Sequence, residues 1–368
     1  MLAVFANDLG ASFIDKHLAD LAPKETVAVG SYGAIPELAG IWPVSCPAFF
    51  TDRWRLSLPV RLAARAGFSL EEMLGKAVER YLRRNRATVV LGEYLDQFLP
   101  FANLMERMGL PYVVQGHGID VSARLRDPKM AEAYRGYASA KAVLTRSEPH
   151  RRRLIELGLP PEKVHVNHGG VDVPDAPRER DAAAGKRLLA VGVMAPKKAP
   201  IYLLESFRRA AARDAELSLD YIGGGPLFPA AAQFVEACGL ADRVRLHGVA
   251  PEALKQQLLG ECGVFVQHSM TDPATGDEEG LPAAIQEAMA AGLAVVSTRH
   301  AGIPEAVIEG ETGLLVDEGD VDAMADAFLR VGATAAQMGR AGHAEALAKH
   351  AWRCERDRLR EWLFGAAA

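Results

Sequence analysis

The stretch "EEGLPAAIQEAMAAGLAVVST", residues 278–298, connects a turn, a helix and a strand, and this order decides the class of fold. Residues 281–291 have small and apolar side chains at helical spacing, whereas residues 294–298 are uncharged and rich in β-branched side chains. A helix that leads directly into a buried strand is the repeating unit of parallel α/β sheets. We therefore predict an α/β protein.

The same alternation continues on both sides of this stretch. Apolar runs such as "TVVLG" (88–92) alternate with helical segments in the first half, and a second series begins at "RLLAVGV" (187–193). The helices are predicted at residues 12–21, 70–84, 99–108, 131–139, 201–213, 227–238, 252–259 and 281–291. Residues 169–187 lack apolar periodicity and are rich in Gly, Pro, Ala and charge, which is typical of a linker. We predict two Rossmann-like domains, 1–172 and 173–349, whose parallel sheets face each other across a cleft.

Composition limits the classes of function. The 368 residues are 49% apolar and 24% charged with a formal charge of −5, which argues against a disordered chain or a general nucleic-acid-binding protein. Four cysteines lie far apart and form no metal-like cluster with histidine: Cys46, Cys238, Cys262 and Cys354. The N-terminus has no basic leader, and no run of 18 uncharged apolar residues occurs. We expect a reduced, cytoplasmic protein that is neither secreted nor membrane-spanning.

The turn before the helix has the chemistry of a phosphate site. Pro282 suits the first turn of a helix because its missing N–H costs nothing there, and Gly280 permits the close approach of a ligand. The free N–H groups around Gly280, Leu281 and Pro282 can hold a phosphate. Glu287 leans back towards a ribose attached to that phosphate, and Glu279 precedes the helix beside a transferred sugar. The alternative is that Glu279 is an N-terminal helix acid and Glu287 a solvated residue.

The flanking sequence resembles a known family. The stretch "EEGLPAAIQEAMAAGLAVVSTRHAGIPEAVIEGETGLLVDEGD" (278–320) is similar to the retaining, nucleotide-sugar-dependent glycosyltransferases of family 4. The segments "ASFIDKHL" (11–18) and "KKAP" (197–200) resemble its bacterial exopolysaccharide and capsule members. Two acids separated by seven residues and a later Gly-x-Pro-Glu recur in that family in this order. The resemblance implies the GT-B fold, with two Rossmann-like domains and a donor site in the second. It also implies that residues 350–368 form a helix that packs back on the first domain.

A lysine-containing loop resembles the diphosphate site of that family. "VGVMAPKKAPIYLLESF" (191–207) is similar to the strand, loop and helix whose basic residues bind the donor diphosphate. The resemblance implies that Lys198 is the phosphate lysine, with Lys197 beside it. The family usually has an arginine where this chain has Val193, and Lys197 is the candidate substitute.

Two further loops resemble the parts that surround the donor nucleotide. They are "YIGGGPLF" (221–228) and "VRLHGVAPEAL" (244–254). The resemblance implies donor contacts at Gly224, Gly225 and Val249. Without the family, the three consecutive glycines have an equally good explanation as a tight turn between strand and helix.

The first half of the chain carries the predicted sugar and acceptor contacts. "PYVVQGHGIDVS" (111–122) resembles a strand and loop with a histidine that meets the donor sugar or the acceptor, so His117 takes that role. "NDLGASFIDKHLADL" (7–21) resembles, more loosely, the loop and helix that admit the acceptor, which implies Gly10 and Ala11.

The resemblance implies a reaction. A hexosyl group moves, with retention, from a nucleoside diphosphate sugar to a hydroxyl of a glycan, lipid-linked or small-molecule acceptor; a UDP-sugar is the first expectation and a GDP-sugar the second. The implied catalytic residues are His117, Glu279 and Lys198. The lysine loop and the helix amides take the leaving charge, so no metal or other cofactor is expected.

Three other functions are alternatives to this one. A non-hydrolysing nucleotide-sugar epimerase shares the architecture but needs acid and base carboxylates, and the Lys198 and Glu279 pattern fits a transferase better. A dinucleotide oxidoreductase loses its main support, because Phe228 stands where the fingerprint Gly-x-Gly-x-x-Gly requires glycine. A non-catalytic sugar-binding protein would also close on its ligand, but that class is usually exported.

Residues 51–86 differ in charge from the rest of the chain. They hold a net charge of +5, with apolar residues between the arginines, in a chain of −5. Such a segment can dock peripherally on an anionic leaflet at the inner membrane face. The alternative is a solvated helix face with ordinary core contacts.

Overall fold

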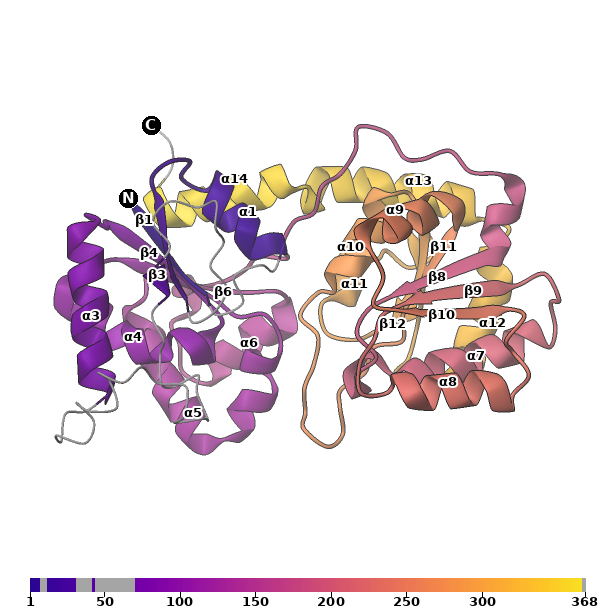
Figure 1. Ribbon diagram of the computed structural model, residues 1–368, viewed down its shortest axis with the longest axis horizontal. Helices are drawn as coiled ribbons and strands as arrows, with labels where there is room; N and C mark the ends of the chain where they lie inside the picture. The colour runs from indigo at the N-terminus through magenta and orange to yellow at the C-terminus, as the bar shows by residue number, and fades with distance from the viewer. Residues whose placement is uncertain (7–11, 31–41, 44–69, 366–368) are drawn as a thin grey trace. The chain divides into compact units, whose positions relative to one another are not determined.

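The computed structural model describes residues 1–6, 12–30, 42–43 and 70–365, and the chain divides into two compact units. The first unit comprises Met1–Arg146, His150–Asn167 and Arg356–Ala368. The second comprises Ser147–Pro149 and His168–Glu355. Each unit is a parallel sheet with helices on both faces, so the α/β prediction is confirmed (Figure 1).

Within the described residues, the first unit is built on a seven-stranded sheet in which all neighbours are parallel. In sheet order the strands are β3 (Trp42–Pro43), β2 (Thr26–Gly30), β1 (Leu2–Phe5), β4 (Val89–Glu93), β5 (Tyr112–Gln115), β6 (Ala142–Thr145) and β7 (Val164–Val166). The strand order reverses between β1 and β4. In doubly wound sheets the carboxyl ends of the strands on either side of such a reversal form the ligand crevice.

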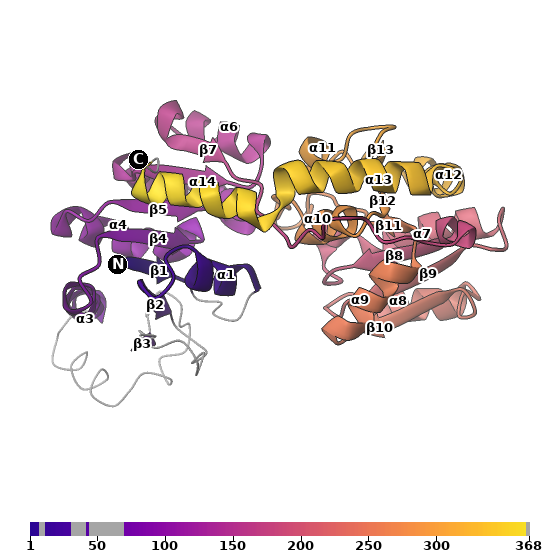
Figure 2. The same cartoon turned by 90° about the horizontal axis from the view of Figure 1, so that it is seen from above.

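Helices cover both faces of this sheet (Figure 2). One face packs against α3 (Leu70–Arg84), α4 (Leu95–Met108), α5 (Pro128–Tyr134) and α6 (Glu148–Glu156). The other packs against α1 (Ser12–Asp20) and the end of α14 (Trp352–Phe364), whose Leu359 and Leu363 are buried with Ile14 and Leu18. The last helix of the chain therefore completes the core of the first unit.

The second unit is built on a six-stranded parallel sheet in its described part. In sheet order the strands are β10 (Val244–Gly248), β9 (Ser218–Ile222), β8 (Arg187–Val191), β11 (Val264–Val266), β12 (Ala294–Thr298) and β13 (Gly313–Val316). The order reverses between β8 and β11, which places the expected crevice at the loops that follow these two strands.

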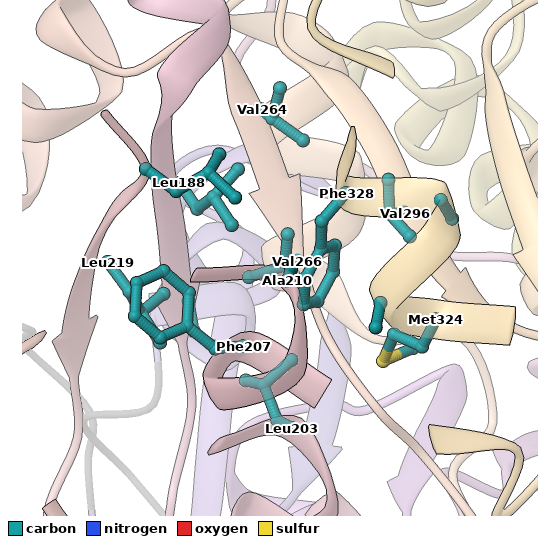
Figure 3. Close-up of a cluster of buried hydrophobic side chains, with 14 of the residues drawn as sticks. Leu188, Leu203, Phe207, Ala210, Leu219, Val264, Val266, Val296, Met324 and Phe328 are labelled. Atoms are coloured by element: carbon teal, nitrogen blue, oxygen red, sulfur yellow. The ribbon is translucent and has the colours of Figure 1, made fainter. Parts of the chain in front are cut away.

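The helices of the second unit bury apolar stripes on each face of its sheet. The helices are α7 (Pro200–Ala211), α8 (Phe228–Ala237), α9 (Glu252–Glu261), α10 (Ala283–Ala290), α11 (Ile303–Ala306), α12 (Val321–Val331) and α13 (Ala335–Glu345). Figure 3 shows one face, where Phe207 of α7 and Phe328 of α12 pack against Leu188 and Val266 of the sheet. Burying one side chain of this size contributes about 1.5–3 kcal/mol.

The segment between the two sheets is fastened to the second unit by Arg180. Its guanidinium donates to the carbonyls of Leu259 and Cys262 at the end of α9, at 2.6 and 2.7 Å. It also donates to the carbonyls of Ala291 and Gly292 after α10, at 2.7 and 3.2 Å. One cation thus caps the carboxyl ends of two helices, where backbone carbonyls lack helical partners and the helix dipole favours positive charge.

Five of the eight predicted helices begin at other residues than expected, and for α5, α7 and α8 the difference is one to three residues. Helix α4 is expected from residue 99 but begins at Leu95 and holds Pro100 inside. Tyr94 precedes it with φ of +63°, and the Leu95 N–H donates to Asp120 Oδ2 at 2.8 Å. Helix α10 begins at Ala283 rather than at 281, with Pro282 as its N-cap residue.

Candidate functional site

Two loops of the second unit meet at the switch point of its sheet. The loop after β8 carries Lys197 and Lys198, and the loop after β11 carries Asp277 and Glu279. The Lys198 Nζ lies 3.3 Å from Glu279 Oε1, and the Lys197 Nζ lies 3.1 Å from Asp277 Oδ1. The Met270 N–H donates to the Lys197 carbonyl at 2.9 Å and joins the loop backbones. The structure therefore brings the predicted Lys197, Lys198 and Glu279 together.

Glu279 is an ionised carboxylate held in a secluded place. Its side chain is 12% exposed. Burial raises the pKa of this carboxyl, but Lys198 and Lys197 lower the pKa by more, so that it lies below its usual range. The two loops therefore hold two lysines in contact with two carboxylates. An anionic ligand would compete with these carboxylates for the lysines.

A buried histidine that the sequence reasoning missed supports the backbone of Glu279. His300 is 2% exposed, and its Nε2 accepts a hydrogen bond from the Glu279 N–H at 3.1 Å. Its Nδ1 then carries the proton and donates to Glu318 Oε1 at 2.7 Å.

The backbone next to His300 is unusual, because Ala301 lies in the left-handed region with φ of +46°. His300 and Glu318 lie just after β12 and β13. Their position as polar residues at the ends of apolar strands could have identified them in the sequence as site residues.

A second buried histidine, His268, is expected to make the stability of the second unit depend on pH. It is fully buried, its Nε2 accepts from the Gly319 N–H at 2.9 Å, and burial lowers its pKa from 6.5 to about 4. Between those two values the unfolded chain binds a proton that the folded chain does not, so stability is lost as the pH falls from about 6.5 to about 4. A pKa lowered this far corresponds to about 3 kcal/mol of stability lost over that range of pH.

A His268→Gln variant is expected to lose this sensitivity, because glutamine keeps an acceptor for Gly319 and does not titrate. The measurement is hydrogen exchange of α12 (Val321–Val331) at pH 7 and pH 4.5 in both proteins. An equal loss of protection in the two proteins would contradict the assignment to His268.

The glycine turn after β9 packs tightly against the loop after β8. A Cβ at Gly223 would lie 1.8 Å from the Gly192 carbonyl oxygen, and Gly225 has φ of +136°. A Cβ at Gly224 would lie 3.1 Å from Val249 Cγ2. The predicted Gly224, Gly225 and Val249 therefore lie together.

Val193 takes part in this contact. A Cβ at Gly225 would lie 2.9 Å from Val193 Cγ1, so the valine that replaces the expected arginine lies beside the glycine turn. Val193 is 58% exposed and Val249 is 90% exposed. Both valines are thus exposed apolar side chains beside the glycine turn.

The start of α10 leaves backbone donors uncapped. No side chain caps the helix at Pro282, and Gly280 and Leu281 are buried just before it. Glu287, five residues into the helix, forms an ion pair with Lys255 of α9, from Nζ to Oε2 at 3.0 Å. The predicted ribose-binding carboxylate is thus held by a lysine that the sequence reasoning did not single out.

His117 belongs to the first unit and lies against a buried carboxylate. Its Nε2 is 2.8 Å from Glu93 Oε2, and the Arg146 Nε is 3.3 Å from its Nδ1. The other Glu93 oxygen is 2.6 Å from His17 Nδ1. The sequence reasoning named His117 alone, and Glu93, His17 and Arg146 are additions from the structure.

Other predictions fall partly or wholly on residues that the structure does not describe. Gly10 and Ala11 lie outside the described residues, as do residues 51–69 of the basic segment. In the parts of the chain that are described, no three His, Cys, Asp or Glu side chains are placed to hold a metal ion. No described helix is both long and apolar enough to cross a lipid bilayer.

Both halves of the chain match models of sugar-transferring proteins. Residues 26–174 match the family described as "Glycosyltransferase Family 4", and residues 185–333 match "Glycosyl transferases group 1". The second match spans all six strands of its sheet, and the first spans its sheet from β2 to β7 without β1. The match to the second includes the loops with Lys198 and with Glu279.

Curated relatives resemble part of the chain. The putative colanic acid biosynthesis glycosyltransferase WcaL of Salmonella typhimurium is 34% identical over 57% of this chain and 52% of its own length. The amylovoran biosynthesis glycosyltransferase AmsK of Erwinia amylovora is 33% identical over 58% and 53%. A GDP-mannose-dependent alpha-(1-6)-phosphatidylinositol monomannoside mannosyltransferase of Mycolicibacterium smegmatis is 32% identical over 53% and 55%. The chain spans about half the length of these relatives.

A solved structure has the same fold. Anabaena Alr3699/HepE in complex with UDP and glucose superposes with a TM-score of 0.76, 16% sequence identity, and 98% of each chain covered. At this identity the likeness shows the fold alone, which is the two-sheet architecture predicted for the GT-B type.

Proposed function

The chain belongs to the family 4 and group 1 glycosyltransferases, and on that premise we propose that it is a retaining, metal-independent hexosyltransferase that uses a nucleoside diphosphate sugar. The acceptor is a hydroxyl of a glycan, a lipid-linked sugar or a small molecule. We also propose that it works in the cytoplasm, peripherally at the inner membrane face if the basic segment 51–86 docks on anionic lipid.

The observation that carries the proposal is the meeting of Lys198 and Glu279 at the switch point of the second sheet, 3.3 Å apart. The lysine loop supplies positive charge for a diphosphate, and the uncapped amides at the start of α10 supply directed donors. Glu287 is placed on the same helix to accept from a ribose. The lysine loop with the α10 amides, Glu287 and Glu279 thus suit the diphosphate, the ribose and the hexose of a nucleoside diphosphate sugar.

The proposed reaction breaks the bond between the anomeric carbon and the leaving phosphate oxygen. Positive charge grows on the sugar and negative charge on the diphosphate, and Lys198 with the α10 amides stabilises the latter. The acceptor hydroxyl forms the new bond on the same face of the sugar, and its proton goes to the leaving phosphate oxygen. Glu279 stabilises the positive sugar and is not consumed.

Names of similar proteins support the choice of substrates to test. HepE was solved with UDP and glucose, and the Mycolicibacterium relative is named as GDP-mannose-dependent. WcaL and AmsK are named for the biosynthesis of colanic acid and amylovoran. We therefore propose a UDP-sugar first and a GDP-sugar second, with a polysaccharide precursor as the acceptor.

Isothermal titration with UDP, GDP and ADP, without added metal, tests the donor site. One nucleotide is expected to bind selectively. The Lys198→Ala and Glu287→Ala variants should each bind it about tenfold or more weakly, because each loses a charge-assisted hydrogen bond of about 1.5–3 kcal/mol. The matched control is Arg213→Ala, which removes a 59% exposed cation of the same unit that pairs with Asp326.

Two results would contradict the proposal. One is the absence of binding by all three nucleotides. The other is equal weakening by Lys198→Ala and by the Arg213→Ala control, which would reduce the interaction to non-specific charge.

A further inference from the structure

The first unit holds a buried carboxylate between two imidazoles. Glu93, at the end of β4, is 1% exposed. Its two oxygens are 2.6 Å from His17 Nδ1 and 2.8 Å from His117 Nε2. We propose that Glu93 is a positioning residue that keeps His117 ready to accept a hydrogen bond at Nδ1 from a hydroxyl of the sugar substrate. The inference rests on the proposed glycosyltransferase function and adds a hydrogen-bond direction to it.

The hydrogen bonds assign the tautomer of His117. Burial raises the pKa of the Glu93 carboxyl, but His17 and His117 lower the pKa by more, so the group is ionised. An ionised carboxylate only accepts, so His117 must present its Nε2–H to it. The Nε–H of Arg146 points at His117 Nδ1 from 3.3 Å, and a guanidinium only donates. His117 therefore carries a proton on Nε2, and its Nδ1 uses its electron pair to accept from Arg146.

A second layer of polar residues orients the carboxylate. Each of four neighbouring strands provides one polar residue at its carboxyl end: Glu93 from β4, Gln115 from β5, Arg146 after β6 and Asn167 after β7. The Gln115 Nε2 donates to Glu93 Oε1 at 3.3 Å, and the Asn167 Nδ2 donates to Gln115 Oε1 at 3.0 Å. The Arg146 Nη1 donates to the Asn167 carbonyl at 3.3 Å. A network in which each side chain bonds to the next fixes the orientation of the Glu93 carboxylate.

The backbone and the ring of His117 are held independently of Glu93. Asp120 Oδ1 accepts from the N–H groups of His117 and Gly118, both at 2.9 Å. The rings of Tyr94 and Phe13 lie with their centroids 4.3 and 5.1 Å from the imidazole. Removal of the carboxylate should therefore change the tautomer of the ring more than its position.

The two ring nitrogens differ in how readily they change partner. Nε2 is bonded at 2.8 Å to a carboxylate whose side chain is 0% exposed, whereas the His117 side chain is 12% exposed. Nδ1 faces Arg146 at 3.3 Å, a long hydrogen bond, and Arg146 retains Asn167 as a second acceptor. A substrate hydroxyl can replace Arg146 at Nδ1. The carboxylate at Nε2 fixes the ring in the tautomer whose Nδ1 accepts, as carboxylates behind other functional histidines do.

Two matched substitutions of His117 distinguish the nitrogens. The amide of asparagine lies near the place of Nδ1, and the longer glutamine places its amide near Nε2. We expect His117→Asn to stay within about tenfold of the wild-type kcat and His117→Gln to fall about 100-fold, the usual size of a lost acid–base contact. The readout is turnover of UDP-glucose and of GDP-mannose, followed as release of the nucleoside diphosphate. The Kd for UDP and GDP is expected to stay unchanged, since those contacts lie in the second unit.

A third variant and a spectrum test the role of Glu93 directly. Nitrogen NMR of protein labelled in its histidines should show His117 with the proton on Nε2. In Glu93→Gln this signal should change, and kcat should fall about tenfold or more at constant nucleotide Kd. Far-ultraviolet circular dichroism confirms that the variants are folded.

Each outcome decides something separate. A proton on Nδ1 of His117 in the wild-type protein overturns the inference, whatever the activity. A Glu93→Gln or His117→Gln variant with wild-type kcat overturns it as well, as does a larger loss in His117→Asn than in His117→Gln. A wild-type protein that turns over neither sugar nucleotide contradicts the proposed function and with it the substrate contact, while the tautomer is still decided by the spectrum.

Discussion

A Glu279→Gln variant is expected to bind UDP or GDP at least as tightly as the wild-type protein and to transfer sugar about 100- to 1000-fold more slowly. The two effects differ in direction because Glu279 interacts with Lys198 when no nucleotide is bound and, in the proposed reaction, with the sugar. Its carboxylate lies 3.3 Å from the Lys198 Nζ, so a diphosphate would compete with it for that cation. In the proposed reaction, its charge faces the positive sugar.

The measurement is a comparison of nucleotide titration with turnover of the sugar nucleotide. The matched control is Asp277→Asn, since Asp277 lies on the same loop and pairs with Lys197 at 3.1 Å. It should affect the rate less, because it adjoins the neighbouring lysine. If Glu279→Gln lowers nucleotide affinity and leaves the rate unchanged, the carboxylate supports the loop and does not act on the sugar.

An Arg180→Ala variant is expected to lower the free energy of unfolding of the second unit by about 3 kcal/mol, because four carbonyls at two helix ends lose a common charged donor. Burial lowers the pKa of Arg180 to about 10, so the guanidinium is still charged at neutral pH. The measurement is unfolding in urea, with hydrogen exchange in α9 and α10 as the probe of the second unit.

The neighbouring Arg178 provides the matched control. It is exposed and donates to the backbone and side chain of Gln256 alone. Arg178→Ala should cost less than about 1 kcal/mol, as surface substitutions usually do. Equal losses in the two variants would show that the linker is held by general charge and not by the capping of α9 and α10.

The sequence predicted the fold well because apolar periodicity is a local property. Helix α3 has the predicted bounds, Leu70–Arg84, since its apolar residues recur at helical spacing. The start of α4 was predicted wrongly, because a tertiary hydrogen bond from the Leu95 N–H to Asp120 holds the first turn before Pro100. A residue 25 positions away in the chain leaves no local signal.

The candidate site was predicted in part. Lys197, Lys198 and Glu279 lie together as expected, because they follow the two strands at which the sheet order reverses. The pairing of Lys255 with Glu287 was not foreseen, since it joins two helices whose relative rotation no local pattern specifies. Glu93 was also missed, although a carboxylate at the end of an apolar strand, "VVLGE", was a visible anomaly.

The return of α14 to the first sheet affects how the protein is made. A ribosome synthesises the second unit, up to Glu355, before it adds Leu359 and Leu363, which close the core that begins at Leu2. The unit encoded first is thus finished last, contrary to the usual order of folding during translation. Until those final leucines emerge, the face of α1 around Ile14 and Leu18 lacks its cover, and the nascent chain is expected to need protection by a chaperone at that stage.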